Sequence, residues 1–96
     1  MAYEIKWSDP AQDEIHEIIN YLLEEWGDKA AEQLSEQILE ISELLEKHPY
    51  AGRRHDTLKA VREFRVKPHY LLYYTVIESR REILVLDLVD SRRRNH

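Results

Sequence analysis

The chain has no cysteine, few glycines and no long apolar run, and each of these absences narrows what it can do. Without cysteine it can form no disulfide, no thiolate metal site and no thiol nucleophile, which suits a reducing compartment. Two glycines, Gly27 and Gly52, and three prolines leave no glycine-rich loop for a nucleotide phosphate and no linker. No apolar stretch approaches the roughly 20 residues that span a bilayer. We therefore expect a cytoplasmic protein with no membrane segment and no cofactor.

The length of 96 residues predicts a single domain, residues 1–96, with one small hydrophobic core. Its net charge of -5 conceals an uneven distribution along the chain. Residues 1–47 carry thirteen acidic and three basic side chains, whereas residues 48–96 carry six acidic and eleven basic ones. The acidic total therefore hides a basic face, which the second half of the chain supplies.

A short strand and two helices are predicted in the acidic half. Residues 3–7 alternate between apolar and polar side chains, as a half-buried strand does. Ser8 and Pro10 begin a helix, Gly27 ends it, and Asp28 is placed to cap the next one. Apolar residues recur at helical spacing through both stretches until Pro49 stops the second. The pattern predicts an αα-hairpin with a minimal turn.

Three strands are predicted in the basic half. Residues 61–67, 69–77 and 82–89 are rich in Val, Ile, Leu and Tyr, and polar turns separate them. The fold class is therefore α+β: a short N-terminal strand, the αα-hairpin, and a three-stranded antiparallel meander with the helices packed on one face. Both faces of the middle strand are apolar or aromatic, so something other than the helices should cover its second face. That face is a candidate partner surface.

Several short motifs follow one another along nearly the whole chain. The second helix ends in His48-Pro49 with Gly52-Arg53 behind it, and the first basic strand reads Val61-Arg62-Glu63. The others are Trp7-Ser8, Ala11, residues 18–21, Trp26-Gly27, Ala30-Ala31, His69-Tyr70, Tyr73-Tyr74 and the final Asp90-Ser91-Arg92-Arg93. In this order they resemble the RelE/ParE superfamily of toxins.

The resemblance implies a toxin of a type II toxin-antitoxin module of the plasmid-stabilisation kind. A small cognate antitoxin would lie across the toxin and neutralise it, and the complex would bind operator DNA through the antitoxin. Tyr70, Tyr73 and Tyr74 are the candidate antitoxin-binding residues. Within the superfamily, some toxins inhibit DNA gyrase without a known hydrolytic site, and others cut messenger RNA on the ribosome.

The available cations favour the gyrase branch. An RNase that works without metal needs a base, cationic donors and an acid in one pocket. The candidates for such a site are Arg65, Lys67, Arg92 and His96. The resemblance places an arginine of the RNA-cutting branch where this sequence has Leu71, and the net acidic charge does not suit an RNA-rich target. Whether the chain is an enzyme stays open, with the balance towards a non-enzymatic inhibitor.

The gyrase hypothesis assigns target binding to Arg62, Arg65, Arg92, Arg93 and Arg94. The three consecutive arginines are equally consistent with a solvated tail. The alternatives are a ribosome-dependent mRNA endonuclease and a non-toxic, degenerate member that only binds a partner protein.

Other polar residues have ordinary structural explanations. Glu63 is expected to form a cross-strand or helix-capping ion pair and to have no substrate role. Asp87 lies in an apolar strand and would need a donor if it is buried, which an arginine such as Arg62 or Arg65 could supply. The histidines lack the spacing of a metal site, so we expect no metal.

Overall fold

The helices begin and end close to the capping residues of the sequence. The computed structural model describes residues 2–93, in which α1 spans Asp9–Glu25 and α2 spans Asp28–Lys47. The Ser8 hydroxyl accepts a hydrogen bond from the Ala11 N–H at 3.2 Å, which caps α1 as predicted. Gly27 follows α1 with a φ of 93°, a value that favours glycine. Gly27 is also the N-cap residue of α2, so Asp28 lies in the first turn instead of capping it.

The strands form one mixed sheet of five strands, which is larger than the predicted meander. Its order is β1 (Glu4–Trp7), β5 (Glu82–Asp90), β4 (Tyr70–Ile77), β3 (Arg62–Val66) and β2 (Arg53–Arg54). The β5–β4–β3 part is the expected antiparallel meander. β1 adds to it by pairing with β5 in parallel, and β2 adds two residues beside β3. Short 3-10 turns follow β4 (Glu78–Arg80) and β5 (Ser91–Arg93).

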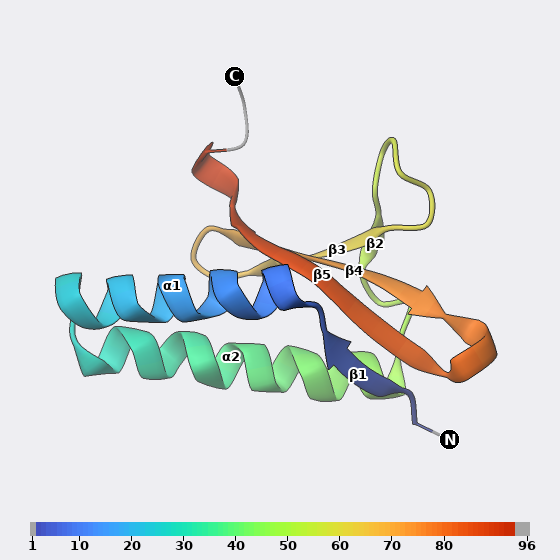
Figure 1. The fold of residues 1–96 in the computed structure, drawn as a ribbon, viewed down its shortest axis with the longest axis horizontal. Helices are drawn as coiled ribbons and strands as arrows, with labels where there is room; N and C mark the ends of the chain where they lie inside the picture. The colour runs from blue at the N-terminus through green and yellow to red at the C-terminus, as the bar shows by residue number, and fades with distance from the viewer. Residues whose placement is uncertain (1, 94–96) are drawn as a thin grey trace.

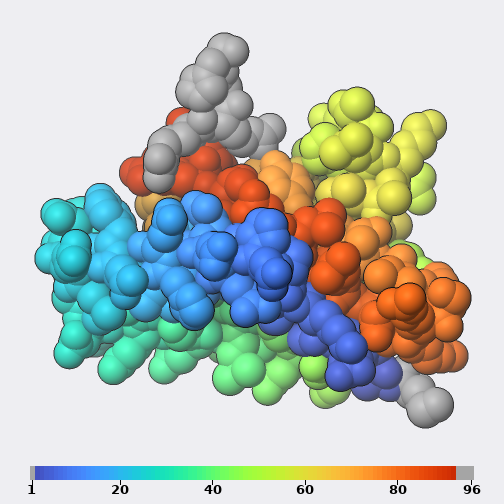
Figure 2. All heavy atoms as spheres, viewed as in Figure 1, coloured from blue at the N-terminus to red at the C-terminus, as the bar shows by residue number. Residues whose placement is uncertain are grey.

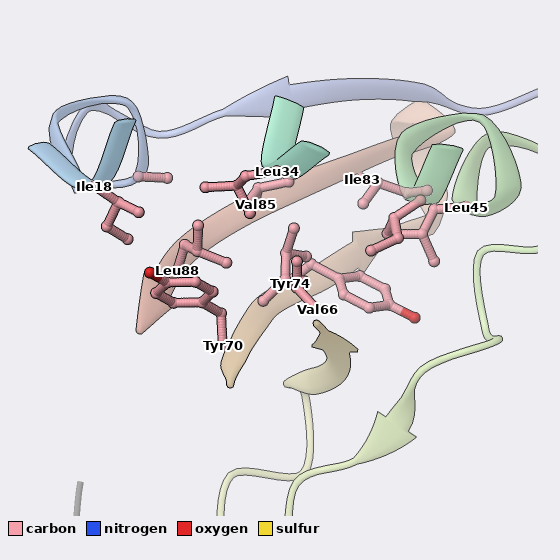
Figure 3. Packing of buried hydrophobic residues seen from close by; sticks show 12 residues of the cluster. Ile18, Leu34, Leu45, Val66, Tyr70, Tyr74, Ile83, Val85 and Leu88 are labelled. Carbon is pink, nitrogen blue, oxygen red and sulfur yellow. The ribbon is translucent and has the colours of Figure 1, made fainter. Parts of the chain in front are cut away.

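Both helices lie on the same side of the sheet, as expected (Figure 1). The core fills the space between these two layers, where side chains of β4 and β5 meet those of α1 and α2 (Figure 3). Tyr74, Leu72, Ile83, Leu88 and Leu45 are its largest fully buried members, with Val66 and Val85. Neither helix of residues 2–93 is long and apolar enough to cross a membrane.

The second face of the sheet is partly covered by the chain itself. Residues 55–61, between β2 and β3, stand above the sheet on the side away from the helices (Figures 1 and 2). The Thr75 hydroxyl donates to the Ala60 carbonyl at 2.6 Å, and the His55 ring lies 5.9 Å from that of Tyr73. The apolar outer face of β4 is therefore covered in part by this loop, and Tyr73 beneath it is half-buried.

Candidate binding surfaces

The end of β4 near Tyr74 is closed by the segment that follows α2. The Tyr74 hydroxyl accepts from the Gly52 N–H at 2.8 Å and donates to the Pro49 carbonyl at 2.9 Å. The ring is fully buried, and this burial raises the pKa of Tyr74. The Tyr74 side chain is thus committed inside the molecule and offers no surface to an antitoxin.

Arg62 is held at the same place. Its guanidinium donates to the carbonyls of Gly52 at 2.8 Å and Tyr50 at 3.2 Å, and it lies 5.0 Å from the centre of the Tyr50 ring. These contacts fix residues 48–53 against β3. Arg62, which was assigned to target binding, therefore has a clear structural task.

The two acidic residues of the sheet have different partners. Glu63 lies opposite Arg53 in the register of β2 and β3, and their side chains form an ion pair at 2.9 Å. This confirms the expected cross-strand pair. Asp87 is only partly buried, and its carboxylate accepts from the N–H of the next residue, Leu88, at 2.8 Å instead of from an arginine. A backbone donor one residue away removes the need for a cationic partner.

A charged cluster lies where β5 ends beside the β3–β4 turn. The Arg92 guanidinium donates to both carboxylate oxygens of Asp90, at 3.2 and 3.0 Å, and His69 Nε2 is 3.7 Å from Asp90. The hydrogen bond from Arg92 is the main cause that lowers the pKa of Asp90 to about 2. The Ser91 hydroxyl and N–H both donate to the His69 carbonyl at 2.8 Å. The cluster thus ties the end of β5 to the β3–β4 turn.

Next to this cluster, a groove of about 700 Å³ separates the tip of the helical hairpin from the β3–β4 turn. We call it the hairpin-tip groove. Its apolar lining includes Leu22, Leu34 and Tyr70, and its cationic lining includes Lys29, Lys67 and Arg92. Two large aromatic side chains at its helical side, Tyr21 and Trp26, are 53% and 71% exposed. Exposed aromatic rings beside cations are typical of protein-binding surfaces.

The groove brings together some of the predicted site residues and leaves others apart. Lys67 and Arg92 line it, and so does Tyr70, whose ring is otherwise buried. Arg65 lies opposite Leu71 in the sheet register, on the face away from the helices and with its side chain exposed. Arg93 ends the described range, while Arg94 and His96 lie outside it.

Sequence reasoning missed the contribution of the hairpin tip. The apolar spacing of the first helix runs up to Trp26, yet Trp26 is mostly exposed. The available signal was its position directly before Gly27, where α1 ends. Within residues 2–93 no group of three or more His, Asp or Glu side chains could hold a metal ion.

The arrangement of elements is shared with solved toxin-antitoxin proteins. A chain from the chromosomal ParDE system of P. aeruginosa matches with a TM-score of 0.75 and 18% identity, covering 93% of this chain and 96% of that one. A chain of the RelBE2 complex of Mycobacterium tuberculosis matches at 0.66 and 17%, covering 94% and 99%. The isolated E. coli RelE toxin matches at 0.62 and 19%, covering 96% and 87%. At these identities the likeness establishes the fold, which is that of the RelE/ParE toxins.

The family follows from the sequence itself. The model of the ParE toxin of the type II toxin-antitoxin system parDE matches residues 5–95. The chain therefore belongs to the ParE toxin family, and the resemblance found from its motifs is confirmed. No curated protein matches it significantly.

Proposed function

We propose that this toxin inhibits DNA gyrase by binding it, and that a cognate antitoxin neutralises it. Membership of the ParE family supports the toxin and antitoxin parts of the proposal. The observation that carries the choice of target is the separation of the cations named for RNA cleavage. Arg65 does not line the hairpin-tip groove that holds Lys67 and Arg92, and the Arg92 guanidinium is engaged by Asp90. Such an arrangement suits contacts spread over a protein surface.

The target-binding residues of this proposal are Arg65 and Arg92, with Arg93 and Arg94 next to them in the sequence. The Arg65 and Arg92 side chains are exposed and cationic, so they can form charge-complementary contacts that guide association with the target. For the antitoxin we propose Tyr73 on the outer face of the sheet and Tyr70 in the hairpin-tip groove. Exposed Tyr21 and Trp26 extend that groove and supply the kind of aromatic anchor that partner proteins use.

One observation supports the alternative of a ribosome-dependent mRNA endonuclease. Lys67, His69 and Arg92 line the same groove, which places two cations beside a group that can carry a proton. In that case the groove would hold RNA, and Arg65 would play no part in cleavage. A non-toxic member that only binds a partner would keep the groove and lack both activities.

The deciding experiment compares gyrase supercoiling and transcript integrity with the purified chain. We expect loss of supercoiling in a reaction of gyrase, relaxed plasmid and ATP, and no cleavage of messenger RNA on programmed ribosomes. Arg65→Ala and Arg92→Ala should weaken inhibition, while Arg80→Ala, an exposed arginine in the turn after β4, serves as the matched control. Cut transcripts with normal supercoiling would contradict gyrase inhibition and support the mRNA endonuclease. If the chain changes neither supercoiling nor transcripts, it is a non-toxic protein that only binds a partner.

A further inference from the structure

Asp90, at the end of β5, holds Arg92 by its main chain and by its side chain. The Asp90 Oδ1 atom accepts from the Arg92 main-chain N–H at 2.9 Å and from Nε at 3.2 Å, and Oδ2 accepts from Nη2 at 3.0 Å. The Asp90 side chain is only 10% exposed, whereas that of Arg92 is 65% exposed. A buried carboxylate therefore fixes both the start and the end of an exposed side chain.

The β3–β4 turn keeps the carboxylate itself in place. The Ser91 N–H and hydroxyl both donate to the His69 carbonyl at 2.8 Å, and the His69 ring lies beside the carboxylate of Asp90. Asp90 is also aligned with Tyr70 in the register of β4 and β5. An exposed arginine normally loses rotamer freedom when it binds a partner, and one that is already ordered loses less. Arg92 is ordered in this way.

The Arg92 guanidinium has a second edge that points away from Asp90. A guanidinium can donate pairs of parallel hydrogen bonds from the Nε–Nη2 edge and from the Nη1–Nη2 edge. Asp90 takes the first of these. Arg92 lies between the hairpin-tip groove and a neighbouring hollow of about 660 Å³, and Tyr21 and Tyr70 line both. The Nη1–Nη2 edge is therefore oriented beside two tyrosines before a partner arrives.

The surroundings of this edge favour a single carboxylate over a nucleic acid. Asp90 offsets the charge of Arg92, and Glu14 and Glu17 line the neighbouring hollow. Attraction to nucleic acid depends mainly on cations that remain unneutralised. A planar carboxylate instead gains from two aligned donors, which arginine supplies whatever the net charge nearby. The chemistry of the site thus matches an acidic side chain of a protein.

We propose that Asp90 is a positioning residue, which holds Arg92 so that its Nη1–Nη2 edge binds an aspartate or glutamate carboxylate of the target. The inference rests on the proposed function for the role of Arg92 in target binding, and it adds the group that is bound and the residue that orients Arg92. If Arg92 acted through charge alone, removing the negative charge of Asp90 would strengthen binding. Positioning predicts the opposite sign.

The test measures the amount of toxin that halves gyrase supercoiling. Asp90→Asn should raise this amount about fivefold, although its amide oxygen can still accept from the Arg92 main-chain N–H. Asp87→Asn removes the same charge from the same strand and is the matched control, with a change of about twofold or less. Arg92→Lys keeps the charge but has no second edge, so it should lose about tenfold or more, as Arg92→Ala does.

Two further readouts separate positioning from a general structural role. In the Arg92→Ala background, Asp90→Asn should have no further effect, because Asp90 acts through Arg92. The ¹⁵N–¹H heteronuclear NOE of the Arg92 Nε should exceed that of exposed Arg80 and fall to the Arg80 value in Asp90→Asn. This second measurement requires no target. An Arg92 Nε as mobile as that of Arg80 in the wild type overturns the inference even if gyrase is inhibited.

Expression of the same variants in cells distinguishes a wrong target from a wrong inference. If growth stops while supercoiling is normal, gyrase is the wrong target, and the variants should rank in the same order by growth arrest. Stronger inhibition by Asp90→Asn, full activity of Arg92→Lys, or a further loss in the double variant overturns the positioning role. Binding to plasmid DNA alone that Arg92→Ala abolishes would overturn the carboxylate. A chain that affects neither growth nor gyrase overturns both the proposed function and the inference.

Discussion

Tyr70 and Tyr74 lie on the same strand and point to the same face of the sheet, yet their surroundings differ (Figure 3). The Tyr74 hydroxyl is enclosed by Pro49 and Gly52, so this end of β4 is sealed by the chain. Tyr70 lies at the wall of the hairpin-tip groove, where the helices and the β3–β4 turn leave a space. An aromatic residue in a central strand is therefore a packing element or part of a binding surface according to what closes over it.

Substitutions where Pro49 and Gly52 enclose Tyr74 should lower the stability of the protein most. A Cβ atom on Gly52 would lie 2.6 Å from the Tyr74 hydroxyl and 2.8 Å from the Glu63 carbonyl oxygen, so Gly52→Ala forces the two segments apart. We expect the free energy of unfolding to fall by about 3 kcal/mol, measured by urea denaturation. Gly27→Ala is an informative comparison because no atom lies within 4 Å of its added Cβ, which leaves only backbone strain. Equal losses of stability at both glycines would contradict the close packing of Gly52 against Tyr74.

Tyr74→Phe separates the hydrogen bonds from the packing. The ring remains, while the Gly52 N–H and the Pro49 carbonyl lose their buried partner. This should cost about 2 kcal/mol by the same measurement. Tyr70→Phe changes the other tyrosine in the same way and serves as the comparison. An unchanged stability for Tyr74→Phe would show that residues 48–52 hold their position by other contacts.

The charged cluster should add a smaller, pH-dependent contribution. The pKa of Asp90 is lowered to about 2 in the folded chain, so the stabilisation is present above the ordinary value near 3.8 and is lost as the pH falls towards 2. Because the partner Arg92 is 65% exposed and screened by solvent, we expect about 1 kcal/mol at neutral pH. The stability difference between the wild type and Asp90→Asn should therefore disappear between pH 4 and pH 2. A difference that persists at pH 2 would have another origin.

Substitutions at the hairpin-tip groove should change the stability of the protein least and partner binding most. Trp26→Ala removes a side chain that is mostly exposed, so the free energy of unfolding should change by about 0.5 kcal/mol or less. If the groove holds the antitoxin, the same change should weaken that complex about tenfold or more, measured by calorimetry. Leu39→Ala provides a control, because Leu39 is also exposed and lies away from the groove. Equal effects of both variants on binding would remove the groove from the interface.

The periodic parts of the fold could be predicted from the sequence. Spacing gave both helices and the three strands of the meander to within a residue or two. The pairing of β1 with β5 could not be predicted, because it joins segments about as far apart as the chain allows. β2 was also missed, since a strand made of two arginines shows no alternation.

In the candidate site, the type of a residue predicted its partners and exposure less well than its position in the fold did. Glu63 could be assigned because its strand partner was simple, whereas the donor to Asp87 is a local backbone group that no pattern reveals. Alternation along the strand separates Tyr73 from Tyr70 and Tyr74, whereas only the segments that close over Tyr70 and Tyr74 distinguish these two. The exposure of Trp26 depends on where the hairpin ends relative to the sheet, which is a property of the tertiary structure.

The parallel pair of β1 and β5 has a consequence for how the protein is made. Glu4 is aligned with Glu82 and Trp7 with Val85, and the Ser8 hydroxyl donates to the Leu86 carbonyl at 3.0 Å. Contacts between such distant segments carry the full entropy of closing the chain between them and form slowly. During synthesis, the first strand and the cap of the first helix emerge before their partner, because β5 is translated after both helices and after β3 and β4. The sheet is therefore completed only after β5 has been translated, and products that stop before β5 also lack Arg92, which lines the hairpin-tip groove.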